Sequence, residues 1–207
     1  NEVIVGRPFT EFLHPEDRVN IQKRYEDRLA GREVPTNYKL PVIHKSGRDV
    51  WVQVNQIVVN WEGAPATLNI ARDITGEHTA EVERKRLLSA IEQAAEVIVI
   101  TDREGNIQYV NPSFEKVTGY TCDEVMGRNP RILKSGVQDT AFYREMWQFI
   151  LSGQRWQGRM VNRRKEGTHY TEEASISPVT DDKGKITHFV AVKRDVTAEV
   201  ETENRLA

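Results

Sequence analysis

Two long stretches of the chain alternate hydrophobic and polar residues with the period of a β-strand. In the first stretch, hydrophobic residues recur at every second position over 38–42 and again over 50–54, with a turn at 45–47 between them. Successive side chains of a strand point to opposite faces of a sheet, so this period of two predicts a hairpin. A turn at 62–63 and an extended segment over 67–72 predict a third strand.

The second stretch repeats this order and adds strands in front of it. Strands are predicted over 160–164, 170–179 and 186–194, and a further hairpin is predicted over 97–110. Landmarks of the two halves keep a separation of 120 to 122 residues: Gly6 and Gly127, Asp17 and Asp139, Gly47 and Gly167, Asp73 and Asp195. Agreement across four separate landmarks indicates a tandem repeat, in which the first copy lacks the front strands.

A different period connects the two copies. Leu87, Leu88 and Ile91 are spaced three and four residues apart, which places them on one face of a helix. Asp73 and Thr75 stand just before this segment and are suited to accept hydrogen bonds from the free amides of its first turn. We therefore predict a connecting helix whose apolar face pairs with the same helix of a second protomer, so that the chain forms a homodimer.

The same capping sequence returns at the end of the second copy, where Asp195 and Thr197 precede an acidic segment. The chain is thus divided into a partial domain over 1–75, a connecting helix over 76–95, a complete domain over 96–197 and the start of an outgoing helix over 198–207. Because each capping sequence stands where a strand ends and a helix begins, we expect it to carry a signal from sheet to helix.

Composition narrows the classes of function. Lys plus Arg number 29 and Asp plus Glu number 31, a formal net charge of −2, whereas a nucleic-acid-binding chain would show a basic stripe. The single cysteine, Cys122, excludes an internal disulfide and a multi-cysteine zinc site. No hydrophobic run approaches the ~18 residues of a membrane-spanning helix. We expect a cytoplasmic location, no metal site, and, since the chain starts abruptly at Asn1, a piece of a longer protein.

The ordered motifs of the second copy resemble a PAS domain. They are ITDREGNIQYVNPSF from Ile100, VTGY from Val117, EVMGRNP from Glu124, NRRKEG from Asn162 and RDVT from Arg194. The resemblance covers residues 97–197, and residues 6–75 resemble the back half of a second PAS domain. It implies an α+β fold with a five-stranded antiparallel sheet in the order 2-1-5-4-3, short helices over one face, and a small cavity between sheet and helices.

The resemblance also suggests which side chains surround that cavity. The hydrophobic candidates are Ile100, Phe114, Met126, Ile132, Leu133, Met146, Ile150, Trp156, Met160, Val190 and Val192. Ordinary core packing is the commoner role of such residues. The residues expected to contact a cofactor or ligand are Phe114, Met126, Asn129, Ile132, Met146, Trp156, Met160, Asn162 and Glu173.

FAD is the cofactor that the motifs favour most, as an alternative to an unidentified ligand. Residues 127–133 resemble the motif of LOV flavin photoreceptors, but Pro130 replaces the cysteine that forms the photochemical adduct there. The segment 156–165 resembles the FAD-binding, redox-sensing PAS domains of nitrogen-fixation regulators, and Asn162 corresponds to an amide that contacts the flavin ring. Against flavin, Glu172 and Lys193 stand where light sensors carry amides. Haem is disfavoured, because no histidine lies on the predicted helix over 139–151.

No catalytic constellation is present in the sequence. There is no phosphate-binding loop, no serine-nucleophile or zinc-protease motif, and no GGDEF or ATP-binding signature. We therefore expect a non-catalytic sensory and relay segment of a multidomain protein, most often a sensor histidine kinase, whose output domain lies outside this chain. Two alternatives stay open: an FAD-binding redox sensor, and a ligand-free dimerisation scaffold upstream of a cyclic-dinucleotide enzyme.

Overall fold

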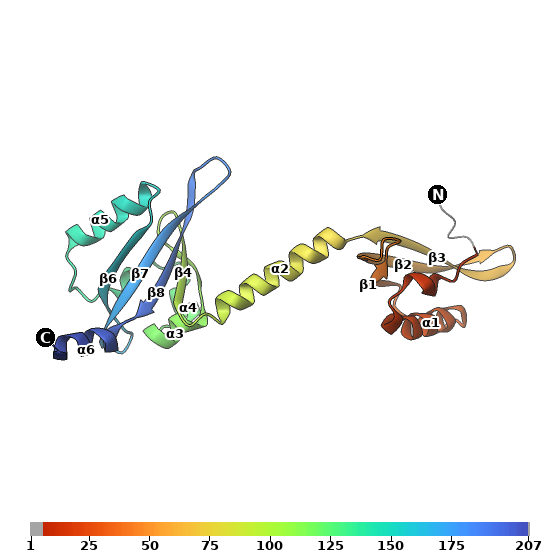
Figure 1. Cartoon of the computed structure of the whole chain (residues 1–207), viewed down its shortest axis with the longest axis horizontal. Helices are drawn as coiled ribbons and strands as arrows, with labels where there is room; N and C mark the ends of the chain where they lie inside the picture. Colours follow the sequence, from red (N-terminus) through yellow and green to blue (C-terminus); the bar gives the residue numbers. More distant parts are fainter. Residues whose placement is uncertain (1–5, 207) are drawn as a thin grey trace. The chain divides into compact units, whose positions relative to one another are not determined.

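The computed structural model describes residues 6–206, in two compact units that divide between Lys85 and Arg86. The first unit is a three-stranded antiparallel sheet with helices over one face (Figure 1). Its elements are η1 (Phe9–Phe12), α1 (Pro15–Leu29), β1 (Asn37–Ile43), β2 (Asp49–Trp61) and β3 (Ala64–Asp73). The sheet order β1-β2-β3 leaves one edge of β3 without a partner strand among the described residues.

The core of the first unit follows the alternating pattern of its strands. Leu40 lies opposite Val52 in the register of β1 and β2, and both side chains are buried together with Val54. Leu13 and Ile21 cover them from the helical side. Full burial of one such aliphatic side chain contributes about 1.5–3 kcal/mol, so this small cluster is what holds α1 against the sheet.

The second unit contains the longer copy of the repeat. It begins within α2 (Thr75–Glu92), which ends three residues before the predicted limit of 95. The elements that follow are β4 (Val97–Asp102), β5 (Ile107–Val110), α3 (Pro112–Thr118), α4 (Cys122–Val125), η2 (Pro130–Leu133), α5 (Thr140–Leu151), β6 (Trp156–Arg163), β7 (His169–Thr180), β8 (Ile186–Asp195) and α6 (Thr197–Leu206).

The five strands of the second unit form one antiparallel sheet in the order β5-β4-β8-β7-β6. This is the expected order 2-1-5-4-3, so the fold class and the strand order are confirmed. The first unit matches the last three strands of this arrangement, because β2 pairs with both β1 and β3 as β7 pairs with β6 and β8. Both copies therefore end on a strand that runs directly into a helix.

The faces of the sheet differ from the prediction at β4 and β8. The inward side chains of β8 are Phe189, Ala191 and Lys193, so the expectation that Val190 and Val192 line the cavity is wrong. On β4 the inward residues are Val99 and Thr101, and Ile100 lies on the other face. Both strands carry hydrophobic residues on both faces, so the period of two locates the strands and leaves their orientation open.

Candidate functional site

A cavity of about 580 Å³ lies in the second unit between the inner face of the sheet and the helices α5 and η2. Its walls are mainly hydrophobic side chains, from Val99, Met146, Trp147, Ile150, Met160, Ile176, Phe189 and Ala191. Sites for small ligands are typically about 300–1,000 Å³ and mostly apolar, with a few placed polar groups. The volume and lining are therefore those of a small-molecule site.

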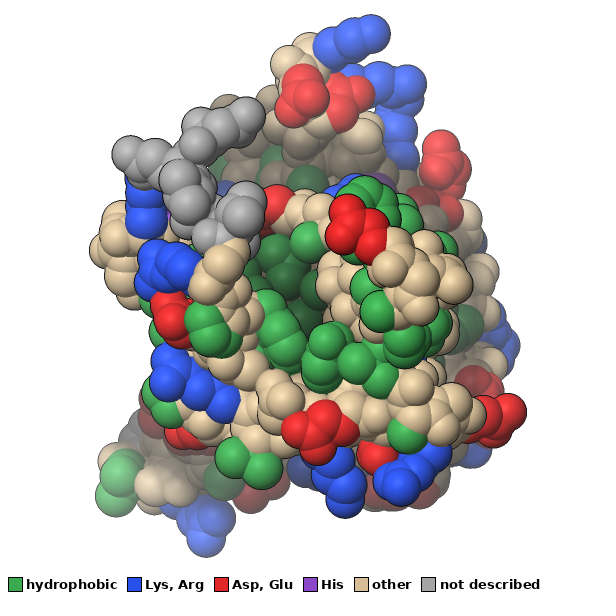
Figure 2. Space-filling model, turned by 90° about the vertical axis from the view of Figure 1, so that its right-hand side faces the viewer, with side chains coloured by type: hydrophobic (Ala, Val, Ile, Leu, Met, Phe, Trp, Pro, Cys, Tyr) green, Lys and Arg blue, Asp and Glu red, His purple; other side chains and the backbone are tan. Residues whose placement is uncertain are grey.

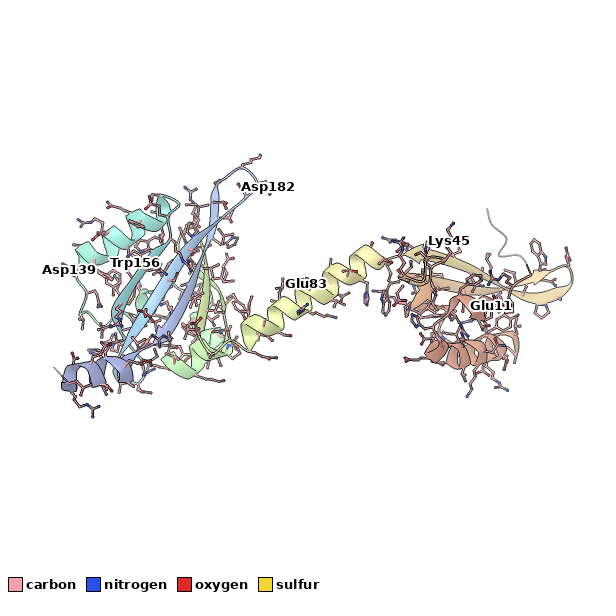
Figure 3. The ribbon with its side chains drawn as sticks, viewed as in Figure 1. Glu11, Lys45, Glu83, Asp139, Trp156 and Asp182 are labelled. Carbon is pink, nitrogen blue, oxygen red and sulfur yellow. The ribbon has the colours of Figure 1, made fainter. Side chains whose placement is uncertain are left out.

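Helix α5 forms one wall because its start and its buried face are both specified locally. Asp139 caps the helix by accepting a hydrogen bond from the Phe142 amide at 2.8 Å. Met146 and Ile150 are buried four residues apart on the side that faces the sheet. The Phe142 ring packs edge-on against Trp156 of β6, with ring centroids 5.8 Å apart. Figure 3 labels Trp156 near α5. These contacts hold α5 along the edge of the sheet and leave the cavity behind it.

The polar part of the inner wall contains a buried ion pair. Lys193 Nζ lies 2.7 Å from Glu172 Oε1, and the two side chains are 10% and 3% exposed. The Tyr170 hydroxyl donates a hydrogen bond to Glu172 Oε2 at 3.3 Å. Burial raises the pKa of Tyr170 far above its usual value, so its hydroxyl keeps its proton and remains a donor. Lys193 and the buried amide of Asn162 both line the cavity.

The remaining charged side chains that line the cavity are exposed and mostly cationic. They are Arg103, Glu104, Arg131, Lys134 and Arg144. Together with Lys193, five of the six charged side chains around the cavity are positive, which favours a ligand with negative charge. Lys134 Nζ stands 3.6 Å from the centre of the Tyr143 ring, and the buried Tyr143 hydroxyl has no hydrogen-bond partner among the described residues. A polar ligand atom would satisfy that hydroxyl.

Four of the predicted ligand-contacting residues come together at this cavity. Asn129, Met146, Met160 and Asn162 all line it. Asn129 also accepts a hydrogen bond from the Arg131 amide at 3.1 Å, which fixes the start of η2.

The other five predicted contacts lie elsewhere. Phe114 is fully buried in the neighbouring core cluster, and Ile132 packs against that cluster. Met126 is 42% exposed on the surface. Trp156 packs on α5 without lining the cavity, and Glu173 lies on the outer face of the sheet. For Glu173 the reason is strand alternation, because Glu172 occupies the inward position.

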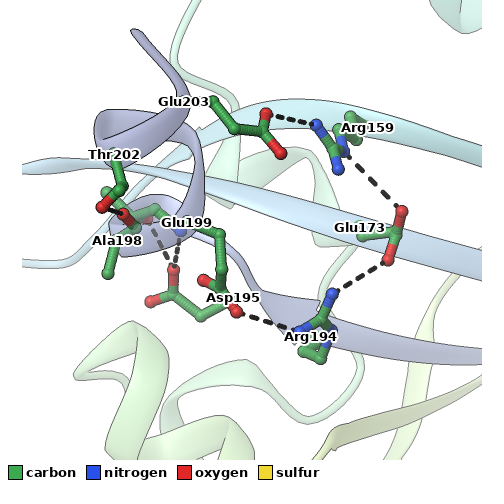
Figure 4. Close-up of polar contacts among 9 residues, drawn as sticks. Arg159, Glu173, Arg194, Asp195, Ala198, Glu199, Thr202 and Glu203 are labelled. Carbon is green, nitrogen blue, oxygen red and sulfur yellow. Dashed lines mark hydrogen bonds and ion pairs between the residues drawn. The ribbon is translucent and has the colours of Figure 1, made fainter. Parts of the chain in front are cut away.

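Glu173 instead joins a charged network between the outer face and α6 (Figure 4). Arg194 contacts Glu173 at 3.3 Å and Glu199 at 2.9 Å, and Arg159 contacts Glu173 at 3.7 Å and Glu203 at 3.5 Å. All of these side chains are about half exposed, so each pair is worth roughly 0–1 kcal/mol after solvent screening. The network therefore contributes only weakly to holding α6 against the outer face of the sheet.

The two capping sequences have the same geometry. Asp73 Oδ1 accepts hydrogen bonds from the Thr75 amide at 2.9 Å and from the Thr75 hydroxyl at 2.7 Å. Asp195 Oδ1 accepts the equivalent bonds from Thr197 at 3.0 Å and 2.5 Å. Each threonine hydroxyl also accepts a bond from a neighbouring strand, from the Trp51 amide in the first unit and the Thr171 amide in the second. The four predicted signalling residues thus connect strands to helices in both copies.

The caps perturb the aspartate pKa values. Hydrogen bonds from the Thr75 hydroxyl and amide hold the pKa of Asp73 below its usual value of 3.8. Burial acts to raise the pKa of Asp195, but the hydrogen bonds from Thr197 and Arg164 outweigh it and leave this pKa also below 3.8. Both carboxylates are therefore ionised near neutral pH, as a helix N-terminus favours.

Asn111 joins the end of α2 to the rest of the second unit. Its side-chain amide donates to the carbonyl oxygens of Ile91 at 3.3 Å and Glu96 at 2.9 Å. Its Oδ1 accepts from the Ile98 amide at 2.9 Å and from the Phe114 amide at 3.3 Å, which caps α3. One buried side chain thus fastens α2, β4 and α3 together.

The predicted dimerisation residues lie on α2, which has no buried residue along its length. Leu87 is 56% exposed and Leu88 is 38% exposed, while Ile91 is half-buried near Asn111. Exposed leucines on a helix are a surface that a second helix can cover.

The first unit has a larger and more open hollow of about 900 Å³ (Figure 2). Its lining is largely hydrophobic and includes Phe12, Leu13, Ile21, Leu40 and Val52. One charged group is buried beside it: Arg28 donates to the Gln56 side chain and, at 2.6 Å, to the Pro35 carbonyl oxygen. Thr67, Asn69 and Ala71 of β3 line this hollow, as the matching residues of β8 line the cavity of the second unit, so the two hollows occupy equivalent places in the two copies.

The described part of the chain, residues 6–206, contains no cluster of three or more metal-ligating side chains. Within the same range, none of the helices combines the length and hydropathy needed to cross a membrane.

Both copies match family models. Residues 85–196 match the model described as PAS fold, and residues 1–76 match the model described as PAS domain. A solved RNA-binding light-oxygen-voltage receptor shares the fold, with a TM-score of 0.56 at 17% identity over 95% of this chain and 88% of the receptor. A solved PAS domain from Colwellia psychrerythraea has a TM-score of 0.50 at 21% identity and covers 56% of this chain and 98% of that domain.

Curated relatives include regulatory proteins and light-activated kinases. A nitrogen fixation regulatory protein of Klebsiella oxytoca is 38% identical over 116 residues, which are 56% of this chain and 23% of the regulator. A blue-light-activated histidine kinase of Brucella canis is 38% identical over 94 residues, which are 45% of this chain and 19% of the kinase. The chain therefore spans less than a quarter of the length of either relative.

Proposed function

Because this chain belongs to the PAS family, we propose that it is a sensory and relay segment of a larger signalling protein, with a small ligand in the second-unit cavity as its input. The observation that carries this proposal is the closeness of the cavity to the exit cap. Lys193 lines the cavity, and Asp195, which caps α6, is two residues further along β8. A ligand that changes the contact between Lys193 and Glu172 would therefore act on the strand that holds the cap.

The energies involved are suited to such a relay. A ligand at one hundred times its Kd stabilises the form that binds it by about 2.7 kcal/mol. A helix cap contributes about 0.5–2 kcal/mol. Ligand binding can therefore decide whether the cap of α6 forms, provided that the ligand binds the two arrangements of β8 with different affinities.

Two protomers would pair through α2 and deliver the change to an output domain outside this chain. Leu87 and Leu88 are exposed hydrophobic residues of α2 available for that pairing, with Ile91 at the edge of the contact. The similarity to a histidine kinase favours a kinase output over other outputs, and the segment itself would transmit the signal without catalysing a reaction.

A second candidate for the ligand is a flavin nucleotide such as FAD, which would make the protein a redox sensor. The cavity residues fit this group: Asn162 and Lys193 would hold the polar edge of the ring, and Arg103, Arg131 and Arg144 would hold its phosphates. A bound flavin supplies a ring that accepts electrons and changes its charge. Pro130 lines the cavity where a cysteine would be needed for a photochemical adduct, so a light-driven adduct is not proposed.

The cavity also bears on the scaffold alternative. A ligand-free scaffold would have side chains filling the space between α5 and the sheet, whereas about 580 Å³ remains open. We therefore favour ligand binding over a purely structural role.

The ligand can be identified by mass spectrometry of the molecules released from the purified chain on denaturation, with FAD added where none is retained. Ala191→Phe should fill the cavity and prevent binding, whereas Val190→Phe on the outer face should bind normally. Hydrogen exchange in α6 should differ between the bound and free protein. Equal exchange in both forms would contradict the relay.

A further inference from the structure

The ion pair of Glu172 and Lys193 is an unusual component for the wall of a mainly hydrophobic cavity. The two side chains are almost completely buried, and their charged atoms are 2.7 Å apart. Buried ion pairs are often no more stabilising than hydrophobic residues of similar volume, because desolvation opposes the attraction. Stability alone therefore does not explain the presence of this ion pair in the cavity wall, whereas a role in ligand recognition would.

Glu172 uses both of its carboxylate oxygens in hydrogen bonds, whereas Lys193 uses only part of its hydrogen-bonding capacity. Both carboxylate oxygens of Glu172 have partners, since Oε1 contacts Lys193 and Oε2 accepts from the Tyr170 hydroxyl. The Lys193 ammonium carries three N–H donors, and its hydrogen bond to Glu172 uses one of them. Lys193 lines the cavity and Glu172 does not. A ligand in the cavity would therefore contact Lys193, whose ammonium has further N–H groups that can donate hydrogen bonds to it.

The surroundings keep this positive charge at the cavity wall. Glu172 is held in place by Tyr170 and lies opposite Asp195 in the register of β7 and β8. Asp195 is itself engaged by Arg164 at 2.7 Å and by Thr197, so it does not compete for Lys193. Asn162 lines the cavity beside this pair and adds an amide that can donate and accept.

We propose that Lys193 is a ligand-contacting residue, that Glu172 is its positioning residue, and that the Lys193 ammonium makes the cavity prefer a ligand whose contacting edge carries negative charge. An ammonium in a site shielded from water attracts an anion more strongly than it would in solution. The ligand's negative edge competes with Glu172 for Lys193, so charge on the ligand changes the contact between β7 and β8.

This inference rests on the flavin form of the proposed function, which supplies a ring that exists with and without negative charge. Reduction adds two electrons and one proton to the neutral oxidised ring and leaves one negative charge on it at mildly alkaline pH. In the cell a low-potential electron-transfer protein would supply the electrons, and dithionite supplies them in the test. The site should therefore bind reduced FAD more tightly than oxidised FAD.

The experiment measures the affinities of the whole chain for oxidised FAD and for dithionite-reduced FAD under anaerobic conditions. Lys193→Gln should reduce the preference for the reduced form by roughly tenfold or more. Lys193→Arg should retain most of the preference. Arg194→Gln removes the neighbouring cation on the outer face and should leave the preference unchanged, which makes it the matched control.

Glu172→Gln separates a positioning role from a merely structural one. Removal of the competing carboxylate should increase the preference for reduced FAD, opposite to the effect of Lys193→Gln. Equal losses in the two variants, or an unchanged preference in Lys193→Gln, would overturn the inference while leaving flavin binding intact. Failure of the unaltered chain to bind either form of FAD would overturn the inference together with the flavin function.

Discussion

Asp73 and Asp195 cap their helices with the same two hydrogen bonds from a threonine, and they differ in what else holds them. Asp195 Oδ2 accepts a hydrogen bond from Arg164 Nη2 at 2.7 Å. The same guanidinium donates to the Val117 carbonyl oxygen at the end of α3 and lies over the Tyr170 ring, 4.5 Å from its centre. The exit cap of the second unit is therefore connected to a helix and a strand of its own domain.

The entry cap has no equivalent of this arginine. The corresponding position of the first copy is His44, whose ring hydrogen-bonds Ser46 at 2.9 Å within its own turn. The start of α2 is instead held by stacking of His78 on Trp51, with ring centroids 3.8 Å apart. The same capping sequence is therefore a local helix start in one copy and a domain-wide junction in the other, according to which side chain reaches the second carboxylate oxygen.

The ion pair near the cap marks the other difference between the copies. The strand positions that hold Glu172 and Lys193 in the second unit hold Val52 and Ala71 in the first. The first copy thus shows that apolar residues are compatible with the fold at these positions. We use this natural contrast, and the contrast between Arg164 and His44, to frame three predictions.

The largest effect is expected from breaking the ion pair on one side. Lys193→Ala leaves the Glu172 carboxylate buried without its cation, which should destabilise the second unit by about 3–5 kcal/mol. Urea denaturation measures this loss of stability, and native-state hydrogen exchange shows whether it is centred on β7 and β8. The double variant Glu172→Val, Lys193→Met replaces both charged side chains by apolar ones and should recover most of the lost stability. A double variant as unstable as the single one would contradict this account.

A smaller effect is expected when the exit cap is made to resemble the entry cap. Arg164→His removes a charge-assisted hydrogen bond that is about one-quarter exposed, so we expect a loss of roughly 1–2 kcal/mol and faster hydrogen exchange in α6. The reciprocal change His44→Arg should leave exchange in α2 nearly unchanged, because the first unit has no α3 carbonyl for the arginine to bind. Faster exchange throughout the second unit, rather than in α6 first, would argue that Arg164 supports the core instead of the cap.

The smallest effect is a pH dependence of the cap itself. The pKa of Asp195 is lowered in the folded protein, so the folded state favours the carboxylate and the unfolded state takes up the proton first. The stabilisation is therefore fully present above the ordinary pKa of 3.8 and is lost as pH falls through the lower pKa of the folded state. Exchange in α6 should rise over that acidic range, and Asp195→Asn should remove the pH dependence. An unchanged acid profile in Asp195→Asn would assign the effect to other carboxylates.

The positions of the strands and both caps could be predicted from the sequence because each depends on a short local pattern, whereas the strand order followed from the resemblance to PAS domains. Alternation locates β1, β2 and β7, and an aspartate two residues before a threonine determines where α2 and α6 begin. The inner face of the sheet could not be predicted in the same way. Ile98, Val99 and Ile100 are all hydrophobic, so only the packing of the helices decides that Val99 faces inward.

The residues that line the cavity could be predicted where a single residue type or a single spacing along one element identified them. Met160 and Asn162 are two positions apart on β6 and therefore share one face of the sheet, and Met146 lies on the buried face of α5. These three residues were predicted to lie beside the cavity, and all three line it. The pairing of Glu172 with Lys193 joins residues 21 positions apart and depends on the register of β7 and β8. Each residue alone suggested a departure from light sensors, and only the sheet brings the two charges together.

Among residues 6–206, one edge of β3 has no partner strand, and this has a practical consequence for work with the 207-residue chain. The strand is ten residues long, and Leu68 and Ile70 on it are 47% and 62% exposed. Unpaired backbone groups on a long hydrophobic edge are a template for strand addition between molecules. Concentrated samples are therefore expected to form β-rich aggregates that grow from the first unit, and a lysine at position 70 is the substitution most suited to keep the sample monodisperse.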